Sequence, residues 1–397
     1  MKKRAMMLLA VIGMLFSGGI VHADLAIQAF DSTGQLTYST LSDGSNYNYQ
    51  VEWAPSPAGP WSAYSGAGSW QAGSQPNQGD NITNFVPMCY RVVATLGDYM
   101  VVDLSGGTNA VNYPISHLTA VPAGGWTDEY KTTKLVFRRI PAGTFTMGSP
   151  TAELGRDSNE IQHQVTITHP FYMGVFEVTQ KQWERVMGTW PSFFNNASYR
   201  DSRPVEQVSY YQIRENPANS DDPAVGWPTN SGVNADSFMG RLRARTGKAF
   251  DLPTESQWEY AGRGGTTTSL NSGKNLTGTG SCPNMAEVGR YWYNGGSGYT
   301  RNGGTSVATA KVGSYQPNAW GLYDIHGNVW EWCLDWYGTY PGTVSDPVGA
   351  SSGSYRVGRG GAWIYYAHGC RVGIRYYAYP HLDSTLMGFR VALPPGQ

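Results

Sequence analysis

The sequence predicts an α+β fold with irregular loops over residues 135–393, preceded by a small all-β module over residues 24–122. Three observations lead to this prediction. Charged residues make up only 14% of the 397 residues, aromatic residues make up 13%, and there are 50 glycines, which is typical of a globular, loop-rich chain. The first region has short alternating apolar and polar stretches, and the second has short helical stretches separated by Gly, Asn and Ser. Residues 123–134 read as the linker.

The first 23 residues read as a secretory signal peptide. Residues 2–4 are basic, residues 5–16 form an apolar stretch too short to span a bilayer comfortably, and residues 21–23 (VHA) offer a small-x-small cleavage site. The alternative is an uncleaved anchor. We expect cleavage and a mature protein outside the cytoplasm, whether secreted, periplasmic or at the cell surface, without a membrane span.

Residues 24–122 carry the pattern of an antiparallel β-sandwich. Residues 48–53 and 89–93 alternate apolar and polar side chains, and the stretches at 54–60 and 66–81 are rich in Pro, Gly, Ser and Asn, which are turn residues. A spacer or docking role is the default expectation for such a module.

Three short helices are expected in the second region, because a capping side chain precedes each of them. They are residues 180–187 after Thr179, residues 237–245 after Asp236, and residues 255–261 after Thr254. Gly188 and Gly247 would end the first two.

Charge and cysteine content narrow the function classes. A formal net charge of −1 gives a nucleic-acid partner no electrostatic support. Cys89, Cys282, Cys333 and Cys370 remain after signal cleavage, and four cysteines in an oxidising compartment allow three complete pairings. No Cys-x-x-Cys or His/Cys cluster indicates zinc.

A series of motifs in the second region resembles the formylglycine-generating enzyme family, also called the sulfatase-modifying-factor domains. The motifs occur in the family's order over residues 135–393. They are residues 140–149 (IPAGTFTMGS), 176–179 (FEVT), 203–205 (RPV), 252–255 (LPTE), 257–260 (QWEY), 321–332 (GLYDIHGNVWEW), 359–361 (RGG) and 388–390 (GFR). The resemblance implies a C-type-lectin-like fold of the formylglycine-generating-enzyme subtype.

The motif at residues 321–332 is a candidate calcium site. It places two carboxylates around a Gly-Asn turn, and such oxygen ligands suit a hard cation. The family resemblance implies that Asp324 and Glu331 bind calcium through their side chains, and Gly327 and Val329 through their carbonyls. The ion would be structural. The alternative is an aromatic-rich turn that binds no ion.

The family's catalytic residues are incompletely matched. Family enzymes oxidise a substrate Cys to an aldehyde with molecular oxygen, and two cysteines five residues apart bind copper(I). Here the second falls on Cys370, but the first falls on Tyr365, which cannot replace a thiolate, and a family Ser falls on Ala362. Copper is therefore not expected. Cys370 is a catalytic candidate only if the chain is active, and otherwise a buried thiol or half-cystine.

The C-terminal segment at residues 362–387 is a candidate binding surface. Tyr gives large contact area at low entropic cost, and small residues let such a surface adapt. The alternative is that these side chains fill the domain's own core. The candidate ligand-binding residues are Trp363, Tyr365, Tyr366, His368, Tyr376, Tyr377 and Tyr379.

The same segment resembles variable proteins of diversity-generating retroelements. These proteins vary a C-terminal stretch framed by Arg-Gly-Gly, Cys-Arg and Gly-Phe-Arg, and this chain has all three at residues 359–361, 370–371 and 388–390. Most residue types between them can be reached from an Asn codon by changing only its adenines. Diversification would leave an Asn-rich near-copy and a reverse transcriptase gene nearby.

Three functional hypotheses follow. The first is an exported, catalytically degenerate protein that binds a protein or glycan ligand in a lectin-like way. The second is an active oxidase that makes formylglycine on a sulfatase. The third is a structural or accessory surface protein docked through its β module.

Overall fold

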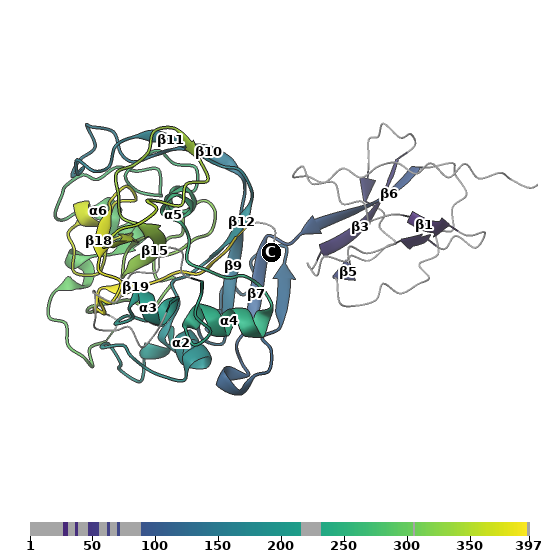
Figure 1. Cartoon of the computed structure of the whole chain (residues 1–397), viewed down its shortest axis with the longest axis horizontal. Coiled ribbons are helices and arrows are strands. Elements are labelled where there is room, and N and C mark those ends of the chain that lie inside the picture. The colour runs from purple at the N-terminus through teal and green to yellow at the C-terminus, as the bar shows by residue number, and fades with distance from the viewer. Residues whose placement is uncertain are drawn as a thin grey trace, which may run out of the picture. The chain divides into compact units, whose positions relative to one another are not determined.

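The computed structural model describes residues 97–215, 232–304 and 306–394, together with the backbone of six strands before residue 97. The predicted signal peptide and most of the predicted β module lie outside the described residues. The chain divides into two compact units, Met1–Asp98 with Ser116–Ala120, and Tyr99–Ile115 with Val121–Gln397 (Figure 1).

The first unit contains two groups of strands. In these, β1 pairs with β2, and β3 pairs antiparallel with β4, β5 and β6. The strands are β1 (Ile27–Phe30), β2 (Leu36–Tyr38), β3 (Tyr47–Ala54), β4 (Ser62–Ala63), β5 (Trp70–Gln71) and β6 (Cys89–Leu96). The all-β character of residues 24–122 stays a prediction, because much of that range is not described.

The boundary between the units differs from the one expected at residue 122. Strand β7 (Tyr99–Asp103) pairs antiparallel with β9 (Lys134–Ile140) inside the second unit. Its residues Met100 and Val102 are buried in that unit's core. Strand β8 (Ile115–Leu118) follows, and most of it clusters with the first unit.

The second unit mixes helices and short strands, as the α+β prediction requires. Its helices are α1 (Glu129–Thr132), α2 (Gln180–Met187), α3 (Tyr210–Ile213), α4 (Phe238–Thr246), α5 (Glu255–Arg263) and α6 (Pro283–Val288). Its remaining strands are β10 (Gly143–Met147), β11 (His163–Ile167), β12 (Phe171–Gly174), β13 (Gly289–Arg290), β14 (His326–Gly327), β15 (Trp330–Trp336), β16 (Val344–Ser345), β17 (Arg356–Arg359), β18 (Tyr376–Ala378), β19 (Met387–Gly388) and β20 (Ala392–Leu393).

Two sheets organise this unit. In one, β20, β12, β9 and β7 lie side by side in this order (Figure 1). In the other, the order is β18-β17-β15-β19, so that β15 is central and β18 is an edge strand. Glu331 of β15 faces Arg359 of β17 on one side and Gly388 of β19 on the other. The motifs at 321–332, 359–361 and 388–390 therefore meet in one sheet.

Helix capping follows the sequence with one correction. Thr179 and Thr254 cap α2 and α5 through complete capping boxes, and Gly188 ends α2 with a left-handed φ of 79°. Helix α4 is capped by the Ser237 side chain, not by Asp236, and ends at Gly247. Ser237 is preferred because its hydroxyl accepts the Gly240 N–H at 3.1 Å.

Removal of the α5 cap should destabilise the domain. In Thr254→Ala the Gln257 N–H loses its acceptor at 3.1 Å, and such caps are worth about 1 kcal/mol. We expect the free energy of unfolding to fall by about this amount in urea. Thr254→Ser keeps the hydroxyl and should stay near the parent value. Equal losses in both variants would show that the hydroxyl is not the source of the stabilisation.

Candidate functional site

Buried arginines hold the C-terminal segment against the domain. The Arg359 guanidinium pairs with Glu259 and donates to the carbonyls of Val372, Gly373 and Ile374. Arg371 pairs with Glu160 at 2.6 Å. Buried ion pairs of this kind are costly to break because a lone charge remains in the interior.

A third arginine fixes the start of β18. Arg375 donates to both oxygens of Glu255 at 2.6 and 2.8 Å. Glu255 lies in the first turn of α5, where the helix dipole favours an acidic residue. The ion pairs of Arg371 and Arg375 lie on either side of residues 372–374. Together with Arg359 they fix the course of the chain from Arg359 to β18.

Cys370 is enclosed and lacks a neighbouring thiol in sequence. Its side chain is buried, and its Sγ lies 3.7 Å from the Ala362 carbonyl. Burial raises the pKa of the Cys370 thiol to about 12, so the thiolate that binds soft metals is disfavoured at neutral pH. Cys282, Cys333 and Cys370 are all free and buried. Any pairing among these three is therefore not formed, and Cys89 lies outside the residues whose side chains are described.

His326 fixes the backbone at Cys370. Its Nε2 accepts the Asn271 N–H at 3.0 Å, and its Nδ1 donates to the Cys370 carbonyl at 2.7 Å. Burial lowers the pKa of His326 to about 4, so the ring is neutral and holds this tautomer. The imidazole therefore serves as a positioning group.

Tyr365 is a packing residue. Its ring meets Trp330 edge-on at 5.3 Å between centroids, and its carbonyl accepts the Trp292 N–H at 2.8 Å. Tyr376 stacks on the same Trp330 at 4.8 Å. Ala362 is also buried. A partly buried ring packed against the core therefore occupies position 365, where the family resemblance implies a thiol.

The seven candidate ligand-binding residues separate into core and surface. Trp363 is only 1% exposed, and Tyr365 and Tyr376 pack on Trp330. His368 is partly buried, and its Nδ1 lies 3.0 Å from the Thr279 carbonyl. By contrast, Tyr366, Tyr377 and Tyr379 are 47%, 49% and 42% exposed. The binding-surface hypothesis therefore fits some residues of this segment, and the core-filling alternative fits the others.

The exposed tyrosines form two groups with rings from elsewhere in the chain. Tyr366 lies 5.7 Å from Tyr293. Tyr377 lies on edge strand β18 and Tyr379 lies just after it. Their ring centroids are 5.0 and 4.5 Å from that of Tyr355, and the Tyr355 and Tyr379 hydroxyls are 3.0 Å apart. We name Tyr355, Tyr377 and Tyr379 the β18 tyrosine cluster. Tyr293 and Tyr355 were missed in the sequence because they lie outside the segment at 362–387.

The predicted calcium ligands occupy a buried acidic region. Asp324 accepts the Gly313 N–H through Oδ2 at 2.6 Å, while its Oδ1 has no hydrogen-bond partner among the described residues. Glu331 is engaged on both oxygens, by Arg390 at 2.7 Å and by the Trp258 indole at 2.6 Å. Gly327 has a φ of 75°, and a Cβ there would lie 1.8 Å from the Arg290 carbonyl.

Glu177 is a third carboxylate in this region, and the sequence did not single it out. It accepts hydrogen bonds from Asn328 at 2.6 Å and from the Val329 N–H at 3.2 Å. Burial, with the charges of Asp324 and Glu331, holds its pKa well above the usual range. The free Asp324 oxygen fits a cation. The Glu331 carboxylate would have to share its oxygens with Arg390. In the described part of the chain, no group of three or more His, Cys, Asp or Glu is arranged to hold a metal ion.

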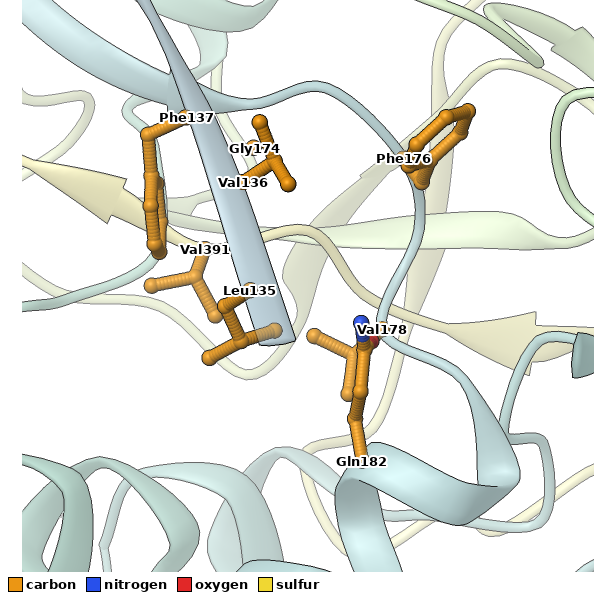
Figure 2. Close-up of a pocket in the computed structure, with 8 residues that line it drawn as sticks. All are labelled: Leu135, Val136, Phe137, Gly174, Phe176, Val178, Gln182 and Val391. Carbon is orange, nitrogen blue, oxygen red and sulfur yellow. The ribbon is translucent and has the colours of Figure 1, made fainter. Parts of the chain in front are cut away.

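A small apolar pocket lies away from these residues. Figure 2 shows it between β9 and the start of α2, with Leu135 and Val391 on one side and Val178 and Gln182 on the other. None of the candidate site residues lines it. No helix in the described part of the chain is long and apolar enough to cross a membrane.

The meeting of the ordered motifs in one sheet agrees with comparison to known proteins. The family model described as the sulfatase-modifying factor enzyme 1-like domain matches residues 127–394. The chain belongs to this formylglycine-generating enzyme family.

Individual relatives cover much of the same region. The "Chaperone protein LppX" of Paenibacillus barcinonensis is 34% identical over 213 residues, or 49% of this chain and 69% of that protein. The "Formylglycine-generating enzyme" of Mus musculus is 28% identical over 289 residues, or 66% of this chain and 75% of that enzyme. The structure of "Treponema denticola variable protein 1" has a TM-score of 0.51 and 29% identity, covering 66% of this chain and 96% of that one.

Glu177 is not the only buried carboxyl of this family domain with a raised pKa, and three others bear on stability near neutral pH. Burial raises the pKa of Asp335 to about 8, that of Glu206 to about 7 and that of Asp324 to about 6. Their stabilising contribution is present below the unfolded pKa, near 4, and is lost as pH rises through the folded pKa. Glu160 and Glu255 behave oppositely. Burial acts to raise the pKa of both carboxyls, but Arg371 lowers that of Glu160 and Arg375 lowers that of Glu255 by more. The stabilisation that these two carboxylates provide is therefore lost in acid.

We therefore expect the free energy of unfolding to fall as pH rises from about 5 to about 8. Urea unfolding at constant ionic strength measures this slope. Asp335→Asn keeps the acceptor for the Glu255 N–H, which lies at 2.8 Å, and should flatten the curve near pH 8. A free energy that increases over this range would contradict the assignment.

Proposed function

We propose that this chain is an exported, catalytically inactive member of the formylglycine-generating enzyme family that binds a protein or glycan ligand through surface tyrosines. The observation that carries the proposal is the division of the tyrosines in the C-terminal segment. The ring of Tyr365, at the position where the family resemblance implies a thiol, packs against the core on Trp330, while Tyr366, Tyr377 and Tyr379 are exposed.

Chemistry argues against oxidase activity. Copper(I) favours two soft thiolates, and Cys370 has a phenol ring at its family partner position, with no sulfur there. Tyr365 packs on Trp330 and Ala362 is buried, and neither side chain supplies the soft sulfur ligand that copper(I) favours. Of the two cysteines that bind copper(I) in the family, this chain matches only the one at Cys370.

The surface argues for binding. Clustered tyrosines with free ring faces are typical of paratopes, because two χ angles fix a large amphipathic area. The likeness to a protein titled a variable protein supports a C-type-lectin-like scaffold whose C-terminal segment diversifies. Such a scaffold would keep the buried arginines and Trp330 and vary the exposed positions. Residues 1–23 support export through the predicted signal peptide.

The first test is an assay for formylglycine. A peptide with the sulfatase-type Cys-x-Pro-x-Arg motif is incubated with the folded protein, copper(I) and oxygen, and aldehyde is read by mass spectrometry. We expect no aldehyde, because one of the two copper thiolates is missing. Conversion at a rate comparable to that of the Mus musculus enzyme would refute the inactive assignment.

The second test separates surface from core tyrosines. Tyr377→Ala/Tyr379→Ala should leave thermal stability close to that of the parent, whereas Tyr365→Ala/Tyr376→Ala should lose several kcal/mol because the rings on Trp330 leave a cavity. On glycan and surface-protein arrays, the first variant should lose the signals of the parent. If it keeps every signal, or if it unfolds, the β18 tyrosine cluster is not the binding surface.

The predicted calcium ion is tested by chelation. The proposed ligands are Asp324, Gly327, Val329 and Glu331, with Asp324 Oδ1 as the oxygen that lacks a partner. A cation that binds only the folded state stabilises it by about 2.7 kcal/mol at 100 times its Kd. EGTA should therefore lower the Tm and calcium should restore it, but not in Asp324→Ala. A Tm that changes with neither EGTA nor calcium would contradict the calcium proposal.

A further inference from the structure

A second face of the family domain combines cations with aromatic rings. It is formed by two loops, residues 190–200 and 299–304, and by Lys311, which lies over the ring of Tyr199. The Asn195 N–H donates to the Arg301 carbonyl at 3.3 Å, and the Asn196 amide donates to the Asn302 carbonyl at 2.6 Å. These bonds hold the loops together. We name Trp190, Tyr199, Arg200, Tyr299, Arg301 and Lys311 the basic aromatic face.

Each cation of this face lies over a ring. Arg200 lies 4.1 Å from the centroid of Trp190, and Lys311 lies 5.9 Å from that of Tyr199. Arg301 lies 5.6 Å from the ring of Phe193. Cation–π contacts keep long side chains extended over the surface, so their charges are presented at fixed positions. Tyr199 and Tyr299 are exposed beside them.

The face carries an excess of positive charge. Arg200 has a carboxylate, Asp201, at 3.9 Å. Arg301 and Lys311 have none within 4 Å among the residues that the structure describes. This excess occurs on a chain whose formal net charge is −1. A local field of this kind concentrates anionic ligands.

A buried arginine lies directly behind the loops. The side chain of Arg203 is fully buried, and its Nη2 donates to the Gly304 carbonyl at 2.6 Å. Its Nε and Nη1 have no hydrogen-bond partner within the described ranges. Burial, with the charge of Arg290, lowers the pKa of Arg203 to about 10. The nearby buried Glu206 opposes this shift and only partly offsets it.

We infer that the basic aromatic face binds an acidic polysaccharide. Tyr rings offer apolar faces to sugar C–H groups, and the phenol and Asn groups of the two loops suit sugar hydroxyls. Arg301 and Lys311 can pair with the carboxylate or sulfate groups of the polysaccharide. Polyglutamate and nucleic acid share the negative charge but lack the repeating sugar hydroxyls, and the experiment below distinguishes them from a polysaccharide. The inference is independent of the proposed function, because it uses none of the candidate tail residues.

The experiment measures binding of the full chain to heparin and hyaluronan fragments by calorimetry at two salt concentrations. Dextran is the neutral control, and polyglutamate and oligo-dT are the non-glycan polyanions. Binding to at least one acidic polysaccharide is expected, weaker at higher salt, with none to dextran. Absence of binding to both acidic polysaccharides, or equal binding to polyglutamate or oligo-dT, would overturn the inference.

Charge reversal locates the site. Arg301→Glu/Lys311→Glu should weaken binding at least 10-fold, roughly the effect of losing two rim charges. Lys248→Glu, outside the face, and Tyr377→Ala/Tyr379→Ala should keep the parent Kd, which separates this inference from the proposed function. If the double charge reversal does not fold, Arg301→Gln/Lys311→Gln replaces it. Unchanged affinity in a folded variant of either kind would overturn the assignment.

Discussion

The buried guanidinium of Arg359 is the constraint on which the C-terminal half of the family domain depends. It pairs with Glu259 of α5 and donates to three successive carbonyls at residues 372–374. Removing one partner of such a pair leaves an uncompensated charge and typically costs 3–5 kcal/mol, roughly. Both ends of the segment between β17 and β18 are tied in this way, by Arg359 at one end and Arg375 at the other, and these buried pairs form its frame.

This frame explains how one aromatic-rich segment has two roles. Rings that turn inward meet Trp330 and become core, as Tyr365 and Tyr376 do. Rings that turn outward lie against other tyrosines: Tyr377 against Tyr337 and Tyr355, and Tyr379 against Tyr355. Tyr365 therefore belongs to the inward-facing rings of the segment, and Tyr377 and Tyr379 belong to its exposed rings.

Much of the fold could be predicted from the sequence, because capping boxes and ordered motifs are local signals. The caps at Thr179 and Thr254 are confirmed, and so are the α+β class and the family. The grouping of residues 99–115 with the second unit was not visible in the sequence, because β7 is placed there by its pairing with β9, which no local pattern shows. Burial was equally hidden: nothing in the run Tyr365-Tyr366 tells which ring faces Trp330. Glu177 was missed because it lies far in sequence from Asp324 and joins it only through the fold.

The most direct test of the central claim, that this scaffold has lost its copper chemistry, is a copper(I) titration of the folded protein against a competing chelator. Thiol counts before and after unfolding accompany it. The account predicts no tight copper(I) site, and a Cys370 thiol that reacts only after unfolding, since burial raises its pKa to about 12. Stoichiometric, tight copper(I) binding that disappears in Cys370→Ser would contradict the account and restore the oxidase interpretation.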